Sequence, residues 1–252
     1  MNHTLSDIQV MTKRNLIKYV RVPQLVVFST IQPVMFLLLF TYVFGGAIKT
    51  GTINYISFLL PGILVQTVLF GAMMTGIGLV DDISRGMIDR FRSLPMARSA
   101  VLAGRTITDL LRNLFVIFLM TGVGYFIGFR IDHGIFNFLA AVGLIALFGF
   151  AFSWISATIG LAVKTPETAQ VAGFIWVFPL VFGSSIFVPV ETMSSVIRAF
   201  AEHTPVTYTV NTVRALTLGL PVGNNVWYAL AWIVGIMIVF VPLAIRSYRR
   251  IS

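Results

Sequence analysis

Long uncharged apolar runs alternate with short polar stretches along this 252-residue chain. A helix that crosses the hydrocarbon core of a bilayer, about 30 Å thick, needs about 20 predominantly apolar residues. Six runs reach that length, and they lie at approximately residues 25–46, 55–80, 100–129, 135–163, 168–190 and 226–245. The pattern therefore predicts an all-α polytopic membrane protein with six transmembrane helices.

The charges indicate how this bundle is oriented. Of the 18 Lys and Arg residues, 14 fall in the N-terminal segment, around residues 81–112, at Lys164 and near the C-terminus, while the other four are Lys49, Arg130, Arg198 and Arg214. Basic residues favour cytoplasmic loops, so we expect both termini and the 81–98 loop to be cytoplasmic. Basic loops against anionic lipid also explain the net charge of +9. No basic stripe interleaved with aromatics indicates nucleic-acid binding.

We expect residues 1–252 to form a single transmembrane domain with two short extensions. Residues 1–24 mix apolar and basic positions, which favours a helix lying in the membrane interface, although a solvated leader would fit almost as well. Residues 25–245 would form the six-span bundle, and residues 246–252 a cytoplasmic tail. With no cysteine in the chain, disulfides and thiolate chemistry are excluded.

The segment Ser84-Arg-Gly-Met-Ile-Asp-Arg-Phe-Arg-Ser-Leu-Pro-Met-Ala-Arg98 is a charged stretch between two apolar runs. Each charge at a bilayer centre costs about 2.5 to 3.5 kcal/mol on insertion scales, so the segment belongs outside the hydrocarbon. Met87, Phe91 and Leu94 recur at helical spacing, with charged residues elsewhere on the same turns. This pattern predicts an amphipathic helix that fits the groove of a partner.

The third run is longer than a bilayer requires. Thirty residues at 1.5 Å each reach about 45 Å, which leaves about three turns beyond the core. These turns hold Arg105, Asp109 and Arg112, whose spacing of four and three places them on one face, so that Asp109 can pair with either arginine. The group would be either an interfacial anchor or a cytoplasmic gate. At a water-exposed edge, we expect Asp109→Asn to accumulate almost normally but to export poorly.

The fifth run is irregular at its end. Two prolines and a glycine in Phe178-Pro-Leu-Val-Phe-Gly-Ser-Ser-Ile-Phe-Val-Pro189 predict a broken helix or a re-entrant turn. Residues 190–224 are too polar to span, but they keep apolar residues at helical spacing. We interpret them as one or two half-helices that dip into the outer face, with an ordinary external loop as the alternative.

Sequence motifs for catalysis are missing from the chain. It contains no G-x-x-x-x-G-K-[ST], no H-E-x-x-H and no G-x-S-x-G. Its three histidines are scattered, and mid-span carboxylates of the kind that ion-coupled transporters use are not apparent. We therefore expect a non-catalytic membrane subunit that binds no cofactor or metal, and whose energy comes from elsewhere.

Three stretches together resemble the type-2 ABC exporter permeases, most closely the daunorubicin-resistance and nodulation branch. Residues 84–95 resemble the family's acidic-Arg-Gly-Thr-x-Glu signature, with Ser84, Met87 and Asp89 as departures. Residues 178–189 are similar to its fifth-span stretch. His203-Thr-Pro-Val-Thr-Tyr-Thr-Val-Asn-Thr-Val-Arg-Ala-Leu216 is similar to its Asn-Pro-x-Thr-Tyr motif, with Thr204 where asparagine is usual.

This resemblance implies site residues in two places. The first is a coupling helix that docks into an ATPase, formed by Arg85, Gly86, Met87, Asp89, Arg90, Phe91, Leu94 and Pro95. The second is an external hairpin motif formed by Pro179, Gly183, Pro189, Pro205, Thr207, Tyr208 and Arg214.

The resemblance also implies an assembly and a cargo. Two permeases, identical or paralogous, would join two separate ATPase subunits, which would bind ATP and Mg, in a prokaryotic inner membrane. The cargo would be lipophilic or amphipathic, such as a drug, an antibiotic or a lipid. Export of a polysaccharide or lipid-linked glycan is the alternative, and a membrane scaffold without transport is a further one.

Overall fold

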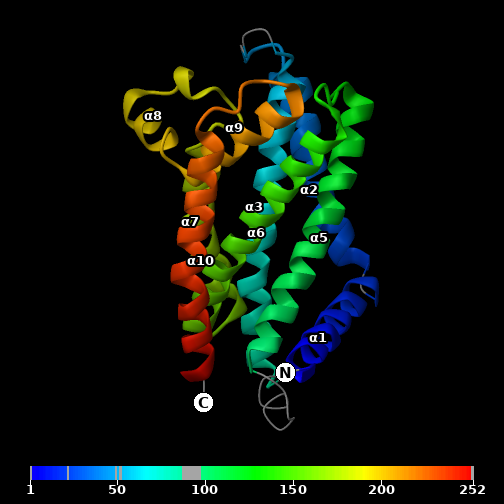
Figure 1. Ribbon diagram of the computed structural model, residues 1–252, viewed down its shortest axis with the longest axis vertical. Helices are drawn as coiled ribbons and strands as arrows, with labels where there is room; N and C mark the ends of the chain where they lie inside the picture. Colours follow the sequence, from blue (N-terminus) through cyan, green and yellow to red (C-terminus); the bar gives the residue numbers. More distant parts are fainter. Residues whose placement is uncertain (1, 22, 49, 51–52, 87–97, 251–252) are drawn as a thin grey trace.

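The computed structural model describes residues 2–21, 23–48, 50, 53–86 and 98–250, and within them it contains helices but no β-strand. The prediction of an all-α protein is therefore confirmed for these residues. In chain order (Figure 1) the elements are α1 (Asn2–Arg21), α2 (Pro23–Leu39), the π-helical turn η1 (Phe40–Phe44), α3 (Tyr55–Ser84), α5 (Arg98–Ile127), α6 (Gly134–Ala162), α7 (Pro166–Phe182), the 3₁₀ turn η2 (Val190–Thr192), α8 (Ser195–Ala201), α9 (Pro205–Leu218) and α10 (Asn225–Arg250).

Each of the six apolar runs contains an apolar helix. Among the described residues, four helices are long and apolar enough to cross a membrane, namely those within α3, α5, α6 and α10. The apolar helices in the first and fifth runs are shorter, at Thr30–Phe44 and Pro166–Phe182. Helix α7, in the fifth run, thus ends well before residue 190, because Gly183 closes it by donating its backbone N–H to the carbonyl of Pro179 at 2.9 Å.

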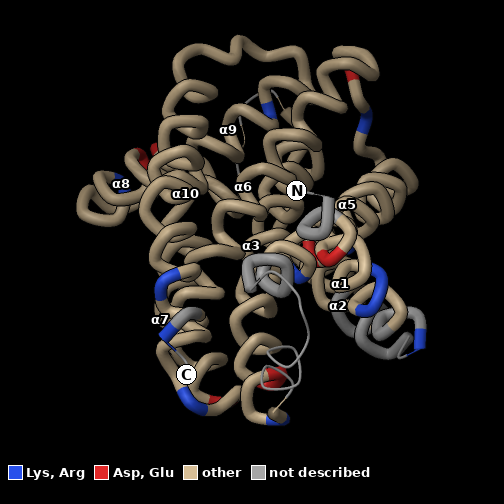
Figure 2. The backbone as a smooth tube through the Cα atoms, turned by 60° about the horizontal axis from the view of Figure 1, so that its bottom comes forward, with Lys and Arg blue, Asp and Glu red and all other residues tan. Residues whose placement is uncertain are grey.

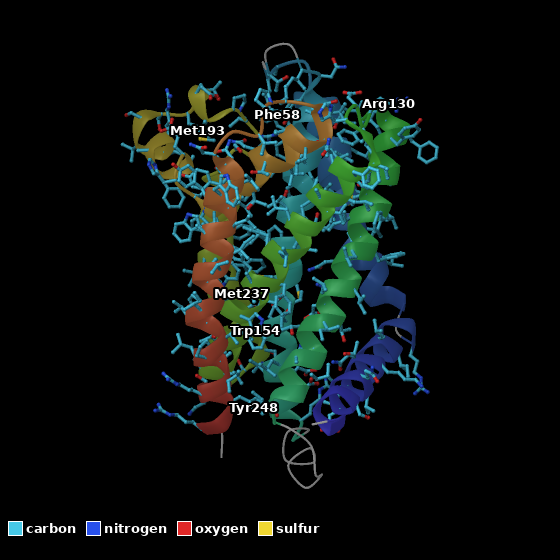
Figure 3. All side chains as sticks on the ribbon, in the orientation of Figure 1. Phe58, Arg130, Trp154, Met193, Met237 and Tyr248 are labelled. Carbon is cyan, nitrogen blue, oxygen red and sulfur yellow. The ribbon has the colours of Figure 1, made fainter. Side chains whose placement is uncertain are left out.

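The long helices run side by side, and the ends of the bundle differ. Both termini lie at the end where α3 finishes and α5 starts, while α8 and α9 lie at the opposite end (Figure 1). Turned to bring the first end forward, Figure 2 shows charged positions gathered there around α1 and the end of α10. Phe58 and Arg130 mark the α9 end and Tyr248 the other (Figure 3). An even number of crossings would produce this arrangement.

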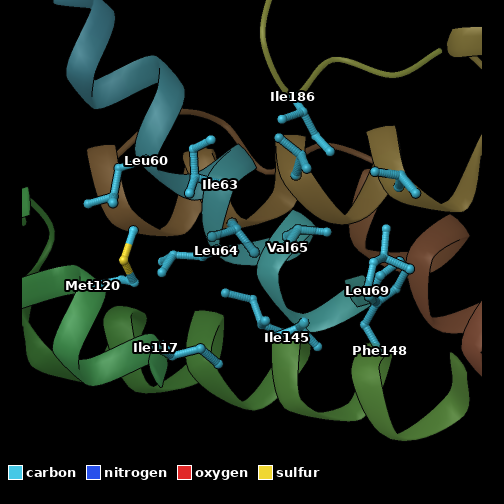
Figure 4. Close-up of a cluster of buried hydrophobic side chains, with 14 of the residues drawn as sticks. Leu60, Ile63, Leu64, Val65, Leu69, Ile117, Met120, Ile145, Phe148 and Ile186 are labelled. Atoms are coloured by element: carbon cyan, nitrogen blue, oxygen red, sulfur yellow. The ribbon is translucent and has the colours of Figure 1, made fainter. Parts of the chain in front are cut away.

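Helix α3 forms the centre of the bundle. Of its most apolar stretch 78% is buried, against 22% for α10, and it contacts α2, α5, α6, α7 and α9. Its leucine and isoleucine side chains interdigitate with those of α5 and α6 (Figure 4), including Ile117 and Phe148, which are both fully buried. A helix that is apolar on all sides is expected in such a position.

Small residues bring α3 and α6 into close contact. A Cβ on Gly160 would lie 2.6 Å from the carbonyl oxygen of Gly76. At the same crossing, Ser156 Oγ donates to the carbonyl of Met73 at 2.9 Å and accepts from the backbone N–H of Gly76 at 3.2 Å. Small side chains allow helices in membranes to approach in this way, and a serine hydroxyl can then bond across the contact.

Threonine and proline define where two helices start. Thr165 and Thr204 each accept a hydrogen bond at 3.2 Å from the backbone N–H three residues on, and Pro166 and Pro205 follow them directly. This is the expected chemistry of a helix N-terminus, where the first N–H groups lack helical partners. At the other end of α9, Gly219 takes a left-handed conformation with φ of 73°.

Candidate functional site

A carboxylate near the charged end of the bundle joins three helices. Asp82, at the end of α3, lies 2.9 Å from Arg105 Nη1 of α5 and 3.6 Å from Arg14 Nη2 of α1. Burial lowers the pKa of the Arg14 guanidinium, and the Asp82 carboxylate opposes that shift. Sequence reasoning missed Asp82 and Arg14, although two acidic residues directly after a long apolar run were a usable signal.

Two arginines of α5 lie across glycines of α3. A Cβ on Gly78 would collide with the Arg105 guanidinium, and one on Gly71 would lie 2.7 Å from Arg112 Nη2. Arg112 Nη2 also donates to the carbonyl of Gly71 at 3.0 Å. The two glycines of α3 are seven residues apart, or about two turns, and so are the two arginines of α5. The same arginine–glycine contact therefore occurs twice along these two helices.

Asp109 is buried in the α3–α5 contact, with 2% of its surface exposed. Its Oδ2 accepts a hydrogen bond from Thr75 Oγ1 at 2.6 Å, and its Oδ1 lies 3.9 Å from Arg112 Nη1. Arg105 instead pairs with Asp82. The three residues predicted as one group are therefore divided between two contacts, and Asp109 is not at the water-exposed edge that helix length predicted, because α3 covers it.

The opposite end of the bundle holds a buried arginine. Arg214 of α9 donates from Nε to the carbonyl of Phe58 at 2.8 Å and from Nη1 to Asn211 Oδ1 at 3.1 Å. It also donates to Ser185 and, at 3.2 Å, to the carbonyl of Ile186. Its guanidinium carbon lies 3.5 Å from the centre of the Phe58 ring. One side chain thus ties α9 to α3 and to the loop after α7.

The other residues of the predicted external hairpin make separate contacts. Thr207 Oγ1 accepts from the backbone N–H of Ser185 at 3.1 Å, and the ring of Tyr208 lies 5.0 Å from that of Tyr228 on α10. Gly183 packs under the ring of Phe200, which leaves no room for a side chain. Pro205 begins α9, whereas Pro189 directly precedes η2.

A continuous series of phenylalanines runs along α7 and crosses to the first apolar helix. Adjacent ring centres are 4.5 to 5.9 Å apart, and Phe178 and Phe182 are about half exposed. The series consists of Phe174, Phe178, Phe182, Phe187, Phe40 and Phe36. Sequence reasoning noted the abundance of phenylalanine but could not show which rings lie next to one another.

Most of the predicted coupling helix lies outside the described residues, namely Met87, Asp89, Arg90, Phe91, Leu94 and Pro95. Arg85 and Gly86 are described. The exposed Arg85 donates from Nε to Asp81 Oδ1 at 2.8 Å, and this bond raises the pKa of Arg85. Gly86 has φ of 67°, so it ends α3 in a conformation that favours glycine. In the part of the chain that the structure describes, no three acidic or histidine side chains come together as metal ligands would.

These features define a polytopic helical membrane protein with a charged network at one end and the short helices α8 and α9 at the other. The chain belongs to the ABC-2 type transporter family, whose model matches residues 6–218. It is 37% identical over 220 residues to the daunorubicin resistance ABC transporter permease protein DrrB1 of Streptomyces coeruleorubidus, covering 87% of this chain and 78% of the relative. It is 29% identical over 244 residues to the probable doxorubicin resistance ABC transporter permease protein DrrC of Mycobacterium tuberculosis, covering 96% and 87%.

A more distant relative is the putative transport permease ycf38 of Cyanophora paradoxa. It is 27% identical over 218 residues, which cover 84% of this chain and 74% of the relative. The family membership predicted from the three motifs is therefore confirmed.

Proposed function

We propose that this protein is the membrane-spanning permease of an ATP-driven exporter that moves lipophilic or amphipathic molecules, drugs among them, out of the cytoplasm or inner leaflet. The likeness to daunorubicin and doxorubicin resistance permeases over most of the chain carries this proposal. The half-exposed Phe178 and Phe182 on α7 support a cargo with apolar or aromatic surface.

The energy would come from a separate ATPase subunit, which would hold ATP and Mg. The permease itself has no phosphate-binding loop. A second permease, identical or paralogous, would complete the membrane part in a prokaryotic inner membrane. The gathering of basic residues at the end with both termini supports a cytoplasmic location for that end.

Residues 84–95 would form the coupling helix on this cytoplasmic end. Arg85 and Gly86 directly follow α3, and Asp82 one turn earlier ties α3 to α1 and α5. A push on the coupling helix would therefore act on three helices. In this proposal Arg105 is an anchor, while the buried Asp109 and Arg112 belong to the contact between α3 and α5.

The short helices after α7 would form a re-entrant hairpin at the outer face. The burial of α9 against α3, α6 and α10 supports this, since an ordinary external loop would not pack into the bundle. Arg214 would hold the hairpin by its bonds to the carbonyls of Phe58 and Ile186.

The first test concerns ATP. We expect the purified permease to hydrolyse no ATP by itself, because it lacks the loop that holds phosphates. Co-purification with its partner ATPase should give hydrolysis that lipophilic drugs stimulate. Sustained turnover by the permease free of any other protein would contradict the proposal.

The second test concerns coupling. Phe91→Asp places a charge on the apolar face of the predicted helix and should abolish ATP-driven daunorubicin uptake into inverted vesicles, or release the ATPase, with normal insertion. A few residues dominate contacts of this kind. Ser93→Asp adds the same charge to the other face and serves as the control. Full uptake by Phe91→Asp would rule out the coupling role.

A further inference from the structure

A cleft opens between α2, α3 and α5, away from the external hairpin and next to Phe36, the last ring of the phenylalanine series. Its walls come from Pro33 and Phe36 of α2, from Phe70 and Met74 of α3, and from Val116 of α5. Gln32 is exposed and Met74 is 43% exposed. In the proposed membrane setting, exposed side chains on an apolar helix would face lipid, so the cleft would be reached from within the membrane.

A buried residue of the cleft wall holds a hydrogen-bond acceptor for which the described residues offer no donor. Gln66 of α3 lines the cleft with 4% of its surface exposed, and its Oε1 has no hydrogen-bond partner among the described residues. A buried polar atom is nearly always paired. An amide oxygen in this position is expected to be satisfied by a molecule that enters the cleft.

The other polar groups of the cleft restrict the charge of such a molecule. Arg112 and Asn113 line the wall next to Gln66, and Arg112 Nη2 donates to Asn113 Oδ1 at 3.2 Å. The carboxylate of Asp109, 3.9 Å from Arg112, balances the positive charge. With the pair neutral overall and aromatic walls on two sides, the cleft favours a flat apolar molecule without net charge.

We propose that this cleft binds neutral ring compounds that carry a hydroxyl group, with Gln66 Oε1 accepting the hydroxyl hydrogen bond and Phe36 and Phe70 contacting the rings. The inference rests on the proposed export of lipophilic molecules and specifies a site and a chemical class for it. The compound would enter sideways from the lipid.

Two probes that differ in one hydroxyl test the proposal. They are 2-(hydroxymethyl)anthraquinone and 2-methylanthraquinone, which share their rings and carry no charge. The permease has no cysteine, so Met74→Cys at the mouth of the cleft can be labelled alone in lipid nanodiscs with a membrane-permeant maleimide. Leu147→Cys on α6 is the control, because Leu147 is similarly exposed at 48% and does not line the cleft.

We expect the hydroxyl probe to protect Met74→Cys at about a tenfold lower concentration than the methyl probe, the effect of one hydrogen bond to a buried acceptor. Neither probe should protect Leu147→Cys. Adding Gln66→Leu should remove the difference between the probes. If Gln66→Leu fails to fold, the comparison of the two probes at Met74→Cys still tests whether the cleft prefers the hydroxyl compound.

Equal protection by both probes, or a hydroxyl preference that survives in a folded Gln66→Leu, would overturn the proposed site. Protection of Leu147→Cys as strong as that of Met74→Cys would also overturn it. ATP-driven daunorubicin uptake into inverted vesicles is measured separately. If the protection test fails but daunorubicin uptake continues, only the proposed site is wrong and the proposed export stands. If the protection test fails and no uptake is found, both the site and the export function are wrong.

Discussion

Two buried arginines are stabilised in different ways. Arg214 has its guanidinium surrounded by carbonyl oxygens and the face of Phe58, an environment that suits a planar group with five donors. Arg112 lies beside the Asp109 carboxylate and over Gly71. Removing a neighbour from either arginine leaves a buried charge, and such a loss is far more damaging than the loss of a surface ion pair.

For Asp109 the structure changes the expected outcome of Asp109→Asn. The substitution keeps an acceptor for Thr75 but removes the negative charge beside the buried Arg112. Breaking a buried pair costs about 3 to 5 kcal/mol, so we expect the variant to accumulate poorly and to melt at a lower temperature in detergent.

Two further variants separate charge from misfolding. Adding Arg112→Gln to Asp109→Asn should restore part of the lost stability, because no unbalanced charge remains. Asp132 is exposed, so Asp132→Asn should have a free energy of unfolding within about 0.5 kcal/mol of the parent's. If Asp109→Asn alone melts like the parent, Arg112 does not depend on this carboxylate.

Arg214→Lys should destabilise the protein by about 2 to 3 kcal/mol, because an ammonium cannot reach the carbonyls of Phe58 and Ile186 together or stack on a ring. Thermal unfolding in detergent measures this loss. The matched control is Arg198→Lys on α8, where the arginine is exposed and bonds only Glu202 among the described residues. Equal melting temperatures for the two variants would show that charge alone is required at position 214.

At the scale of helices, the close crossing of α3 and α6 depends on glycines, which have no side chain to keep the backbones apart. Gly76 and Gly160 bring the two backbones together, and Ser156 bonds across the gap. In lipid, helix association relies on such packing because the hydrophobic effect between helices is missing. The crossing is thus a point at which a single added side chain separates two central helices.

Gly160→Leu should reduce stability by about 1 to 3 kcal/mol, since its Cβ would meet the Gly76 carbonyl at 2.6 Å. Gly143→Leu is the control in the same helix, where an added Cβ meets nothing within 4 Å. Thermal melting of both variants provides the comparison. A Gly160→Leu protein as stable as Gly143→Leu would mean that α3 and α6 shift apart at no cost.

At the scale of the whole molecule, hydropathy predicted the helices because a bilayer imposes one length and one composition on each crossing. The run at 55–80 matched α3 within four residues, whereas the start of α9 at Thr204-Pro205 was not predicted. The end of α7 was missed, since prolines and a glycine show that a helix is interrupted without showing where its last hydrogen bond falls.

The site was predicted less completely than the helices. Arg214 was singled out by its motif, but its partners are backbone carbonyls of residues far away in sequence, and carbonyls carry no sequence signal. The pairing of Arg105 with Asp82 was missed because spacing within one helix cannot reveal a partner on another. That Gln66 Oε1 lacks a hydrogen-bond partner among the described residues can be recognised only when α2, α3 and α5 are placed together.

Asp82 links the end of α3 mechanically to the middle of α1 and to the second turn of α5. A rotation of α3 that began at this end would have to stretch the 2.9 Å contact with Arg105 or carry α5 along, and α1 would follow through Arg14. Thr12 of α1 also donates to the carbonyl of Gly104 at 3.4 Å, which adds a second joint between α1 and α5. If α1 lies along the membrane surface as we propose, it would act as a lever arm, and a cross-link that held it to lipid would stop α3 from turning.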